Sequence, residues 1–193
     1  MPRKILLGVT GSVAAVLTGK LTQALSDLGE VRLVVTDKGR YFTDHIQIVG
    51  ATHIYFEQDE WRTPKGDRVW KQKDDPVVHI ELRDWANVLV VAPLTANTMA
   101  KIRYGLCDNL LTSVIRAWER GKPMIAAPAM NTKMWEHHHT QEQIPWMRDH
   151  GWWIANPQSK ELACGDKGMG AMAPIEEIVD LVARYEPICS DDV

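Results

Sequence analysis

One cysteine in a glycine-rich stretch is the residue of this sequence with the clearest potential for chemistry. Residues 162–172 read Leu-Ala-Cys-Gly-Asp-Lys-Gly-Met-Gly-Ala-Met, so Cys164 stands beside three glycines. A structural cysteine usually packs as a small hydrophobe in an apolar helix or strand, whereas these glycines predict a loop that can fold closely over something small. A reachable thiol there could serve as a nucleophile or as an acid. A lone cysteine is equally compatible with an incidental surface loop, so this segment alone leaves both interpretations open.

Two groups of histidines are further candidates for chemistry. His79 stands before Ile80–Trp85, which predicts a short amphipathic helix; a lone histidine there is more often a cap or core residue, but imidazole is a common catalytic group. The run 137–139 consists of three histidines. Because adjacent residues on a helix face different sides, and because no Cys-x-x-Cys or His-x-x-x-His pair accompanies them, we expect a surface run and no metal site.

Small polar residues follow each of four apolar runs that are typical of buried strands. These ends read Thr10-Gly11-Ser12, Thr36-Asp37-Lys38-Gly39, Pro93-Leu94-Thr95-Ala96-Asn97-Thr98 and Pro128-Ala129-Met130-Asn131. In an open parallel sheet, ligands bind outside the carboxyl ends of the strands, where backbone N–H groups and hydroxyls can meet a phosphate. The pattern therefore indicates a flat, polar, phosphorylated cofactor, although turns also select these residue types. The spacing does not fit G-x-G-x-x-G, so the dinucleotide fingerprint is absent.

The elements that must position these residues predict an α/β fold. We expect a doubly wound, flavodoxin- or Rossmann-like parallel sheet with helices on both faces. The periodicity predicts strands at 5–9, 31–35, 54–56, 88–92, 124–127 and 152–155. Helices are expected at 13–28, from an Asp108 N-cap toward Trp118, from a capping box at Thr140, and from Pro174 onward. Residues 59–75 are charged and irregular, which indicates a surface excursion.

Composition restricts the class of protein. The chain has 193 residues, which suits a single domain over 1–185 followed by a frayed tail at 186–193. A net charge of −3 disfavours nucleic acid or an anionic membrane as the partner, and no apolar run reaches the roughly 20 residues that span a bilayer. Three cysteines at irregular spacing and a start without a signal peptide predict a reducing, cytoplasmic location.

The motifs in combination resemble the flavin-dependent cysteine decarboxylases. The resemblance rests on His79-Ile80-Glu81-Leu82, the 93–98 and 128–131 segments, Met134-Trp135, and Ala163-Cys164-Gly165-Asp166 with Gly168 and Gly170. It extends over nearly the whole chain in the same order and spacing, and the 10–15 segment also fits. Within the family the chain is most similar to the stand-alone, eukaryotic-type enzymes of coenzyme A biosynthesis that convert 4′-phosphopantothenoylcysteine to 4′-phosphopantetheine.

The resemblance also implies a set of site residues. It implies His79 as catalytic base, Asn131 as ligand of the substrate carboxylate and Cys164 as proton donor, with Met130, Glu161 and Ala163 also binding substrate. The segment from Glu161 to Cys164 would close over the substrate. FMN would be held by Gly11, Ser12, Val13, Thr36, Lys38, Thr95, Ala96, Asn97, Thr98 and Ala129. It also implies a homotrimer with FMN and His79 near a subunit boundary.

The implied reaction explains why these residue types are needed. Direct loss of CO2 from an N-acylated cysteine would leave a carbanion without an electron sink. A flavin can accept two electrons from the CH2–SH group, which gives a thioaldehyde; CO2 then leaves and the resulting enethiol is reduced again. A thiol such as that of Cys164 has an ordinary pKa of about 8.5, so it is protonated at neutral pH. It can give the proton that is needed when the enethiol is reduced. The neutral amide of Asn131 can bind a carboxylate without holding its charge in place.

Three other functions stay open on the sequence. Some relatives of the family are regulatory, protein phosphatase-binding homologues, which usually have acidic tails or lack a catalytic residue. Others are peptidyl-cysteine decarboxylases that act on peptide C-termini. A flavin prenyltransferase would share the fold but should lack the cysteine loop.

Two departures from the family pattern are minor: Thr95 stands where serine is frequent, and Asp37 stands where many members have lysine.

Overall fold

Six parallel strands form the central sheet, which confirms the predicted fold class. In the computed structural model their spatial order is β3-β2-β1-β4-β5-β6. The strands are β1 (Arg3–Val9), β2 (Gly29–Val35), β3 (Ala51–Phe56), β4 (Val88–Leu94), β5 (Met124–Pro128) and β6 (Trp152–Ile154). A separate antiparallel hairpin pairs β7 (Gln158–Glu161) with β8 (Lys167–Ala171).

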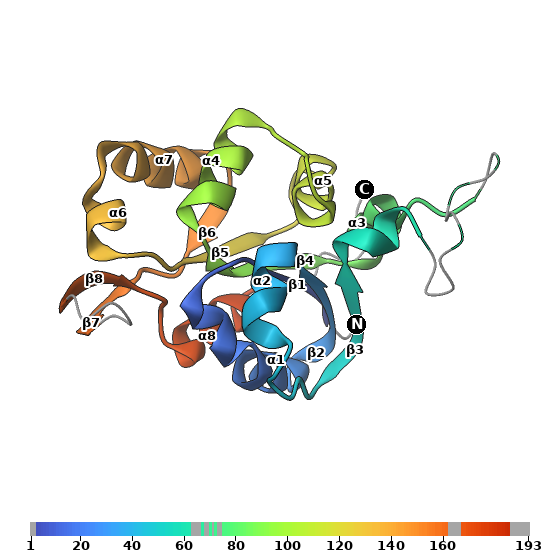
Figure 1. Cartoon of the computed structure of the whole chain (residues 1–193), viewed down its shortest axis with the longest axis horizontal. Coiled ribbons are helices and arrows are strands. Elements are labelled where there is room, and N and C mark those ends of the chain that lie inside the picture. Colours follow the sequence, from blue (N-terminus) through green and yellow to red (C-terminus); the bar gives the residue numbers. More distant parts are fainter. Residues whose placement is uncertain are drawn as a thin grey trace.

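Helices cover both faces of this sheet. In Figure 1, α1, α2 and α8 lie below the sheet, while α4 to α7 lie above it. The helical elements are η1 (Val13–Leu17), α1 (Thr18–Ser26), α2 (Asp37–Thr43), η2 (Glu57–Glu60), α3 (Val78–Trp85), α4 (Ala96–Tyr104), α5 (Leu110–Arg116), α6 (Thr132–Glu136), α7 (His138–Asp149) and α8 (Ile175–Ala183). Among these described helices, none is long and apolar enough to cross a bilayer.

The structure describes residues 3–62, 67, 70, 72, 75–161 and 167–185, with the backbone alone at 160, 161 and 167. Ala163, Cys164 and the expected tail at 186–193 therefore lie outside the described residues, and Glu161 is placed only as the last residue of β7.

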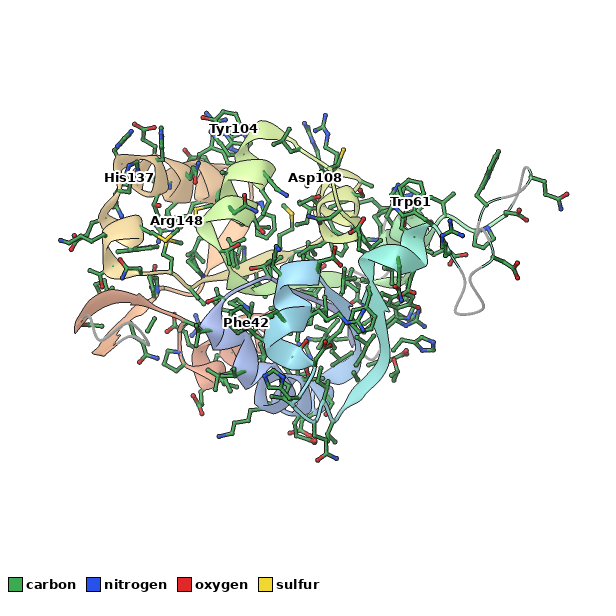
Figure 2. The ribbon with its side chains drawn as sticks, in the orientation of Figure 1. Phe42, Trp61, Tyr104, Asp108, His137 and Arg148 are labelled. Atoms are coloured by element: carbon green, nitrogen blue, oxygen red, sulfur yellow. The ribbon has the colours of Figure 1, made fainter. Side chains whose placement is uncertain are left out.

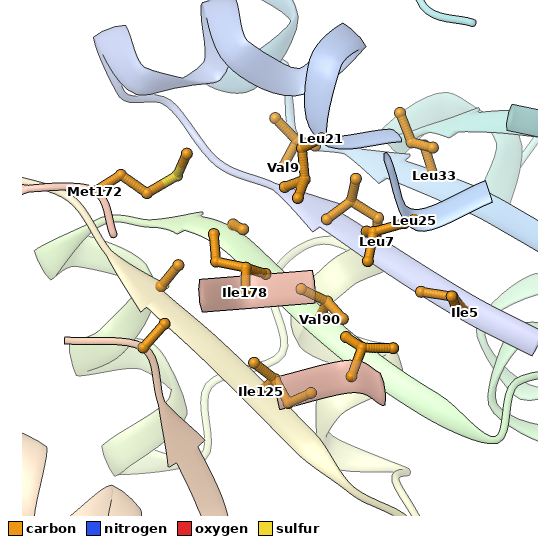
Figure 3. Packing of buried hydrophobic residues seen from close by; sticks show 14 of the residues in the cluster. Ile5, Leu7, Val9, Leu21, Leu25, Leu33, Val90, Ile125, Met172 and Ile178 are labelled. Atoms are coloured by element: carbon orange, nitrogen blue, oxygen red, sulfur yellow. The ribbon is translucent and has the colours of Figure 1, made fainter. Parts of the chain in front are cut away.

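Two hydrophobic cores lie on opposite faces of the sheet. On one face, Leu7 of β1 packs with Leu25 of α1 and Ile178 of α8, all three fully buried (Figure 3). On the other face, Leu6 belongs to a cluster that includes Leu111 of α5. Alternate residues of a strand point to opposite faces, so β1 contributes to both cores, as expected of a strand covered by helices on both sides.

The strand order creates a crevice between β1 and β4. The chain leaves β1 toward η1 and α1 on one face, whereas it leaves β4 toward α4 on the other. Loops that separate at such a topological switch point leave room for a ligand outside the carboxyl ends of the strands.

The structure corrects several predicted boundaries. The helix expected at 13–28 is a 3₁₀ turn followed by α1, and the helix expected after Asp108 has Asn109 as its N-cap. The helix expected from Thr140 already begins at His138. His79 lies inside α3 instead of before it. The elements α2, α4 and the β7–β8 hairpin were not predicted.

Candidate active site

A polar cavity opens at the switch point between β1 and β4. Its volume is about 600 Å³, which is within the range of small-molecule sites, about 300–1,000 Å³. Residues from the ends of four strands and from η2 and α5 line it: Gly11, Ser12, Thr36, Asp37, Lys38, Glu57, Thr95, Ala96, Asn97, Thr98, Lys101, Asp108, Asn109, Ala129, Met130 and Met134. The four polar segments recognised in the sequence therefore meet at one site.

The buried hydroxyl of Thr10 joins two walls of this cavity. Its Oγ1 donates to the carbonyl of Pro93 at 2.7 Å and accepts from the N–H of Thr95 at 3.0 Å. Thr10 is 1% exposed, so both partners are satisfied without water. This pair of hydrogen bonds fixes the loop after β1 against the loop after β4.

The N-termini of three helical elements lie at the cavity. Ser12, Thr36 and Thr95 are the N-caps of η1, α2 and α4, and their hydroxyls accept from Ala14, Gly39 and Thr98 N–H groups. Each cap fixes a first turn whose remaining N–H groups are available to a ligand, and such groups favour anions. Gly11 lacks a side chain where a Cβ would overlap Lys38, so these two loops can approach closely. This donor set suits a phosphate and the polar groups attached to it.

Charged side chains occupy the wall formed by η2, α4 and α5. Lys101 pairs with Asp108 through Nζ–Oδ2 at 2.6 Å, and this hydrogen bond holds the pKa of the Asp108 carboxyl below its usual range. Glu57 accepts from the N–H of Leu110 at 2.7 Å, but burial and the nearby Asp37 raise its pKa. Burial acts in this direction because it disfavours the charged form of a carboxyl group.

Asn131 lies at the opposite wall, beside Met130. Its Oδ1 accepts from the N–H of Lys133 at 2.8 Å and so caps α6, which directs the amide oxygen into the helix. The N–H of Met130 donates to the carbonyl of Gly170 in β8 at 2.9 Å. The hairpin whose two strands flank residues 162–166 is therefore attached next to Asn131.

His79 lies in a different cavity of the same chain. Within the described residues this second cavity has a volume of about 500 Å³ and is lined by Glu60, Trp61, Arg62, Trp70, Pro76, Val77 and His79. The two cavities share none of these described lining residues, although Glu57 and Glu60 stand at the two ends of η2. In Figure 2, Trp61 lies to the right of Asp108. Within one chain, His79 is therefore not among the described residues that line the polar cavity.

The predicted site residues divide into five groups. Ten line the polar cavity: Gly11, Ser12, Thr36, Lys38, Thr95, Ala96, Asn97, Thr98, Ala129 and Met130. Asn131 adjoins it, Val13 is half exposed and does not line it, and His79 lies elsewhere. Ala163, Cys164 and the Glu161 side chain are not described.

Sequence reasoning missed Glu57, Lys101, Asp108, Asn109 and Met134 as lining residues. Asp108 is predicted as a helix cap and Met134 only as part of the family resemblance, and Lys101 carries no signal without the fold. Glu57 follows the predicted strand at 54–56, and its place at a strand end was the one signal that could have identified it.

The histidine run is exposed, as expected, but the argument about its geometry was wrong. The ring centroids of His137, His138 and His139 lie 4.1–5.2 Å apart, and His137 precedes α7 as its N-cap. Figure 2 shows His137 at the upper left, far from Trp61. No arrangement that could hold a metal ion occurs among the described His, Cys, Asp and Glu residues.

The chain is similar to characterised proteins over most of its length. Residues 1–185 match the family model described as Flavoprotein. Phosphopantothenoylcysteine decarboxylases from Arabidopsis thaliana and Mus musculus are each 47% identical; the alignments cover 95% and 91% of this chain and 86% and 83% of those proteins.

Two solved structures have the same fold. A cysteine-to-serine mutant of PPC decarboxylase complexed with pantothenoylaminoethenethiol gives a TM-score of 0.85 at 42% identity, covering 95% of this chain and 97% of that one. The FMN-binding protein AtHal3 gives a TM-score of 0.81 at 42% identity, covering 95% and 96%. With a family model spanning 1–185 and relatives 47% identical, the chain belongs to the Flavoprotein family.

Proposed function

We propose that this chain is an FMN-dependent phosphopantothenoylcysteine decarboxylase, which converts 4′-phosphopantothenoylcysteine to 4′-phosphopantetheine in coenzyme A biosynthesis. The observation that carries the proposal is the polar cavity at the β1–β4 switch point. It occurs in a chain 47% identical to two proteins of that name. A relative of 42% identity has been crystallised with pantothenoylaminoethenethiol, which has the enethiol group expected after loss of CO2.

The residues around the cavity fit FMN. The helix starts after Thr36 and Thr95 offer N–H donors for a phosphate, and neutral side chains such as Asn97 and Thr98 offer hydrogen bonds to a polar ring edge. When bound, FMN supplies a two-electron acceptor for the substrate CH2–SH group and returns these electrons after CO2 has left. The reaction is redox-neutral overall, so the absence of a dinucleotide fingerprint agrees with it.

Three residues of the chain have proposed roles in the remaining steps of the reaction. His79 accepts a proton as the substrate is oxidised. The amide of Asn131 binds the substrate carboxylate, and its neutrality leaves that charge free to depart as CO2. Cys164 gives the last proton; β7 and β8 flank residues 162–166 in the sequence, and β8 is bonded to Met130 beside Asn131. Val13 retains its proposed FMN contact only through its backbone, because its side chain is half exposed outside the cavity lining.

A homotrimer explains the separation of His79 from the polar cavity. If His79 is the base, it must reach the flavin from outside its own chain, and a cyclic assembly provides this at each subunit boundary. The exposed side chains of Trp61 and Trp70 beside His79 suit burial against another subunit. The cytoplasm is the proposed location, since three irregularly spaced cysteines suit a reducing compartment.

A peptidyl-cysteine decarboxylase is the alternative that shares most of this chemistry. A solved FMN-dependent cysteine decarboxylase, SpaF, is 27% identical to the chain, against 42% for PPC decarboxylase. We therefore prefer the small thiol substrate to a peptide.

Two variants test the proposed roles in one anaerobic single-turnover experiment. Purified protein is mixed with 4′-phosphopantothenoylcysteine, and flavin absorbance, CO2 and product are followed. His79→Asn should leave the flavin oxidised, because the first proton has no acceptor. Cys164→Ser should release CO2 and then stall with reduced flavin and the enethiol.

Cys107→Ser is the matched control, since Cys107 is an exposed cysteine outside the described cavities. It should turn over like the wild type. Normal yield of 4′-phosphopantetheine from Cys164→Ser would overturn the acid assignment, and flavin reduction at the wild-type rate by His79→Asn would overturn the base assignment.

A further inference from the structure

The side chain of Glu60 contacts His79 at two points. Glu60 is the last residue of η2, and its Oε2 accepts from the backbone N–H of His79 at 3.0 Å. Its Oε1 lies 2.5 Å from His79 Nδ1. The Glu60 side chain is 8% exposed and that of His79 is 26% exposed. One nearly buried carboxylate thus holds both the backbone and the ring of the histidine.

These two contacts have different purposes. The first caps α3, whose N-cap residue Val77 has no polar side chain for that task. The second contact acts on the ring. A carboxylate can only accept hydrogen bonds, so the hydrogen between Oε1 and Nδ1 must be carried by Nδ1. The neutral imidazole then has its lone pair on Nε2, the nitrogen that points away from Glu60.

We propose that Glu60 is a positioning residue that fixes the tautomer and orientation of His79, so that Nε2 is the proton acceptor of the decarboxylase. This inference rests on the proposed function. Oxidation of the substrate CH2–SH group to CH=S removes a hydride, for which bound FMN would be the acceptor, and the thiol proton would pass to Nε2. The imidazolium that forms is stabilised by the Glu60 carboxylate, as a buried carboxylate does for histidine in other active sites.

Glu60→Gln separates this role from simple helix capping. The glutamine oxygen can still accept from the His79 backbone N–H, so the cap on α3 persists. Its NH2 group would then face Nδ1 and donate to it, which moves the ring hydrogen to Nε2 and removes the base. Flavin reduction by substrate should slow about 10²-fold or more, the range of a lost general base, while FMN content and substrate affinity stay close to those of the wild type.

Glu81→Gln is the matched control, because Glu81 lies on the same helix but is exposed. It should reduce flavin at the wild-type rate. Glu60→Asp keeps the carboxylate with a shorter reach, and partial recovery relative to Glu60→Gln is expected. Wild-type flavin reduction by Glu60→Gln would overturn the proposal.

A spectroscopic measurement on the unmodified protein does not depend on any Glu60 variant folding. Protein labelled with 15N-histidine is recorded at about pH 8.5, where ordinary imidazoles are neutral, and His79→Asn identifies the resonances. The proposal predicts a protonated Nδ1 and an unprotonated Nε2 for His79; the opposite tautomer would overturn it. Failure of the wild type to release CO2 would instead overturn the proposed function and would leave this tautomer result unaffected.

Discussion

Thr10 connects two loops of the site through a single hydroxyl. It donates to Pro93 and accepts from Thr95 within a fully buried environment. The sequence placed Thr10 at the end of a strand but did not show that its hydroxyl bonds to a loop 83 residues away. Only the parallel pairing of β1 with β4 brings these segments together.

Thr10→Val should weaken FMN binding while retaining the fold. Valine has nearly the same shape but leaves the Thr95 N–H and the Pro93 carbonyl without this partner, which costs about 1–3 kcal/mol. Since each 1.4 kcal/mol is about tenfold in affinity, we expect the FMN dissociation constant to rise about tenfold, as measured by flavin fluorescence titration.

Thr22→Val is the control for this substitution. Thr22 is equally buried, and its hydroxyl bonds to the Thr18 carbonyl at 2.8 Å within α1, away from the cavity. Its FMN affinity should match the wild type. Equal weakening by both variants would show that the effect of Thr10 is general loss of stability.

At the scale of elements, β8 follows residues 162–166 and is bonded to Met130, next to Asn131, the proposed ligand of the substrate carboxylate. Gly170 has φ +138°, and a Cβ there would overlap the carbonyl oxygen of Met130. Glycine is therefore needed for the hairpin to approach residues 130–131 so closely.

Gly170→Ala should lower kcat while FMN remains bound. The added methyl group pushes β8 away from Met130, and a displacement of about 1 Å can cost on the order of 10²-fold in rate. Gly151→Ala is the control: Gly151 also has a positive φ, of +85°, but nothing lies within 4 Å of an added Cβ. Steady-state CO2 release and flavin absorbance measure both effects, and an unchanged kcat in Gly170→Ala would contradict the positioning role of β8.

The strands and most of the cavity were predictable because their residue patterns are local. Apolar runs ending in small polar residues identify the strand ends, and parallel topology brings them to one edge. The helices α2 and α4 were missed because each buries only two residues, so neither has a strong apolar period. The α5 cap was assigned to Asp108, whereas Asn109 makes the cap and Asp108 pairs with Lys101.

At the scale of the whole molecule, residues of the proposed site line two cavities that share no described lining residue. His79 and Glu60 line one cavity, and the hydrogen-bond donors that are proposed to hold FMN line the other. The residue patterns alone do not show this division, although the family resemblance already implies that His79 lies near a subunit boundary.

Two inactive variants should restore activity when combined. His79→Asn and Asn131→Asp subunits are coexpressed; in mixed trimers some boundaries pair an intact His79 with an intact Asn131 from the next subunit. For random mixing, roughly a quarter of the boundaries are intact in a heterologous ring, so we expect a similar fraction of wild-type CO2 release. Activity no greater than that of either variant alone would contradict a shared site.

Release of CO2 from carboxyl-labelled 4′-phosphopantothenoylcysteine by the purified, FMN-loaded protein tests the central claim most directly. We predict labelled CO2 and 4′-phosphopantetheine in equal amounts over many turnovers, with the flavin oxidised again at the end and no added reductant or dinucleotide. Protein that binds FMN but releases no CO2 from this substrate would contradict the account.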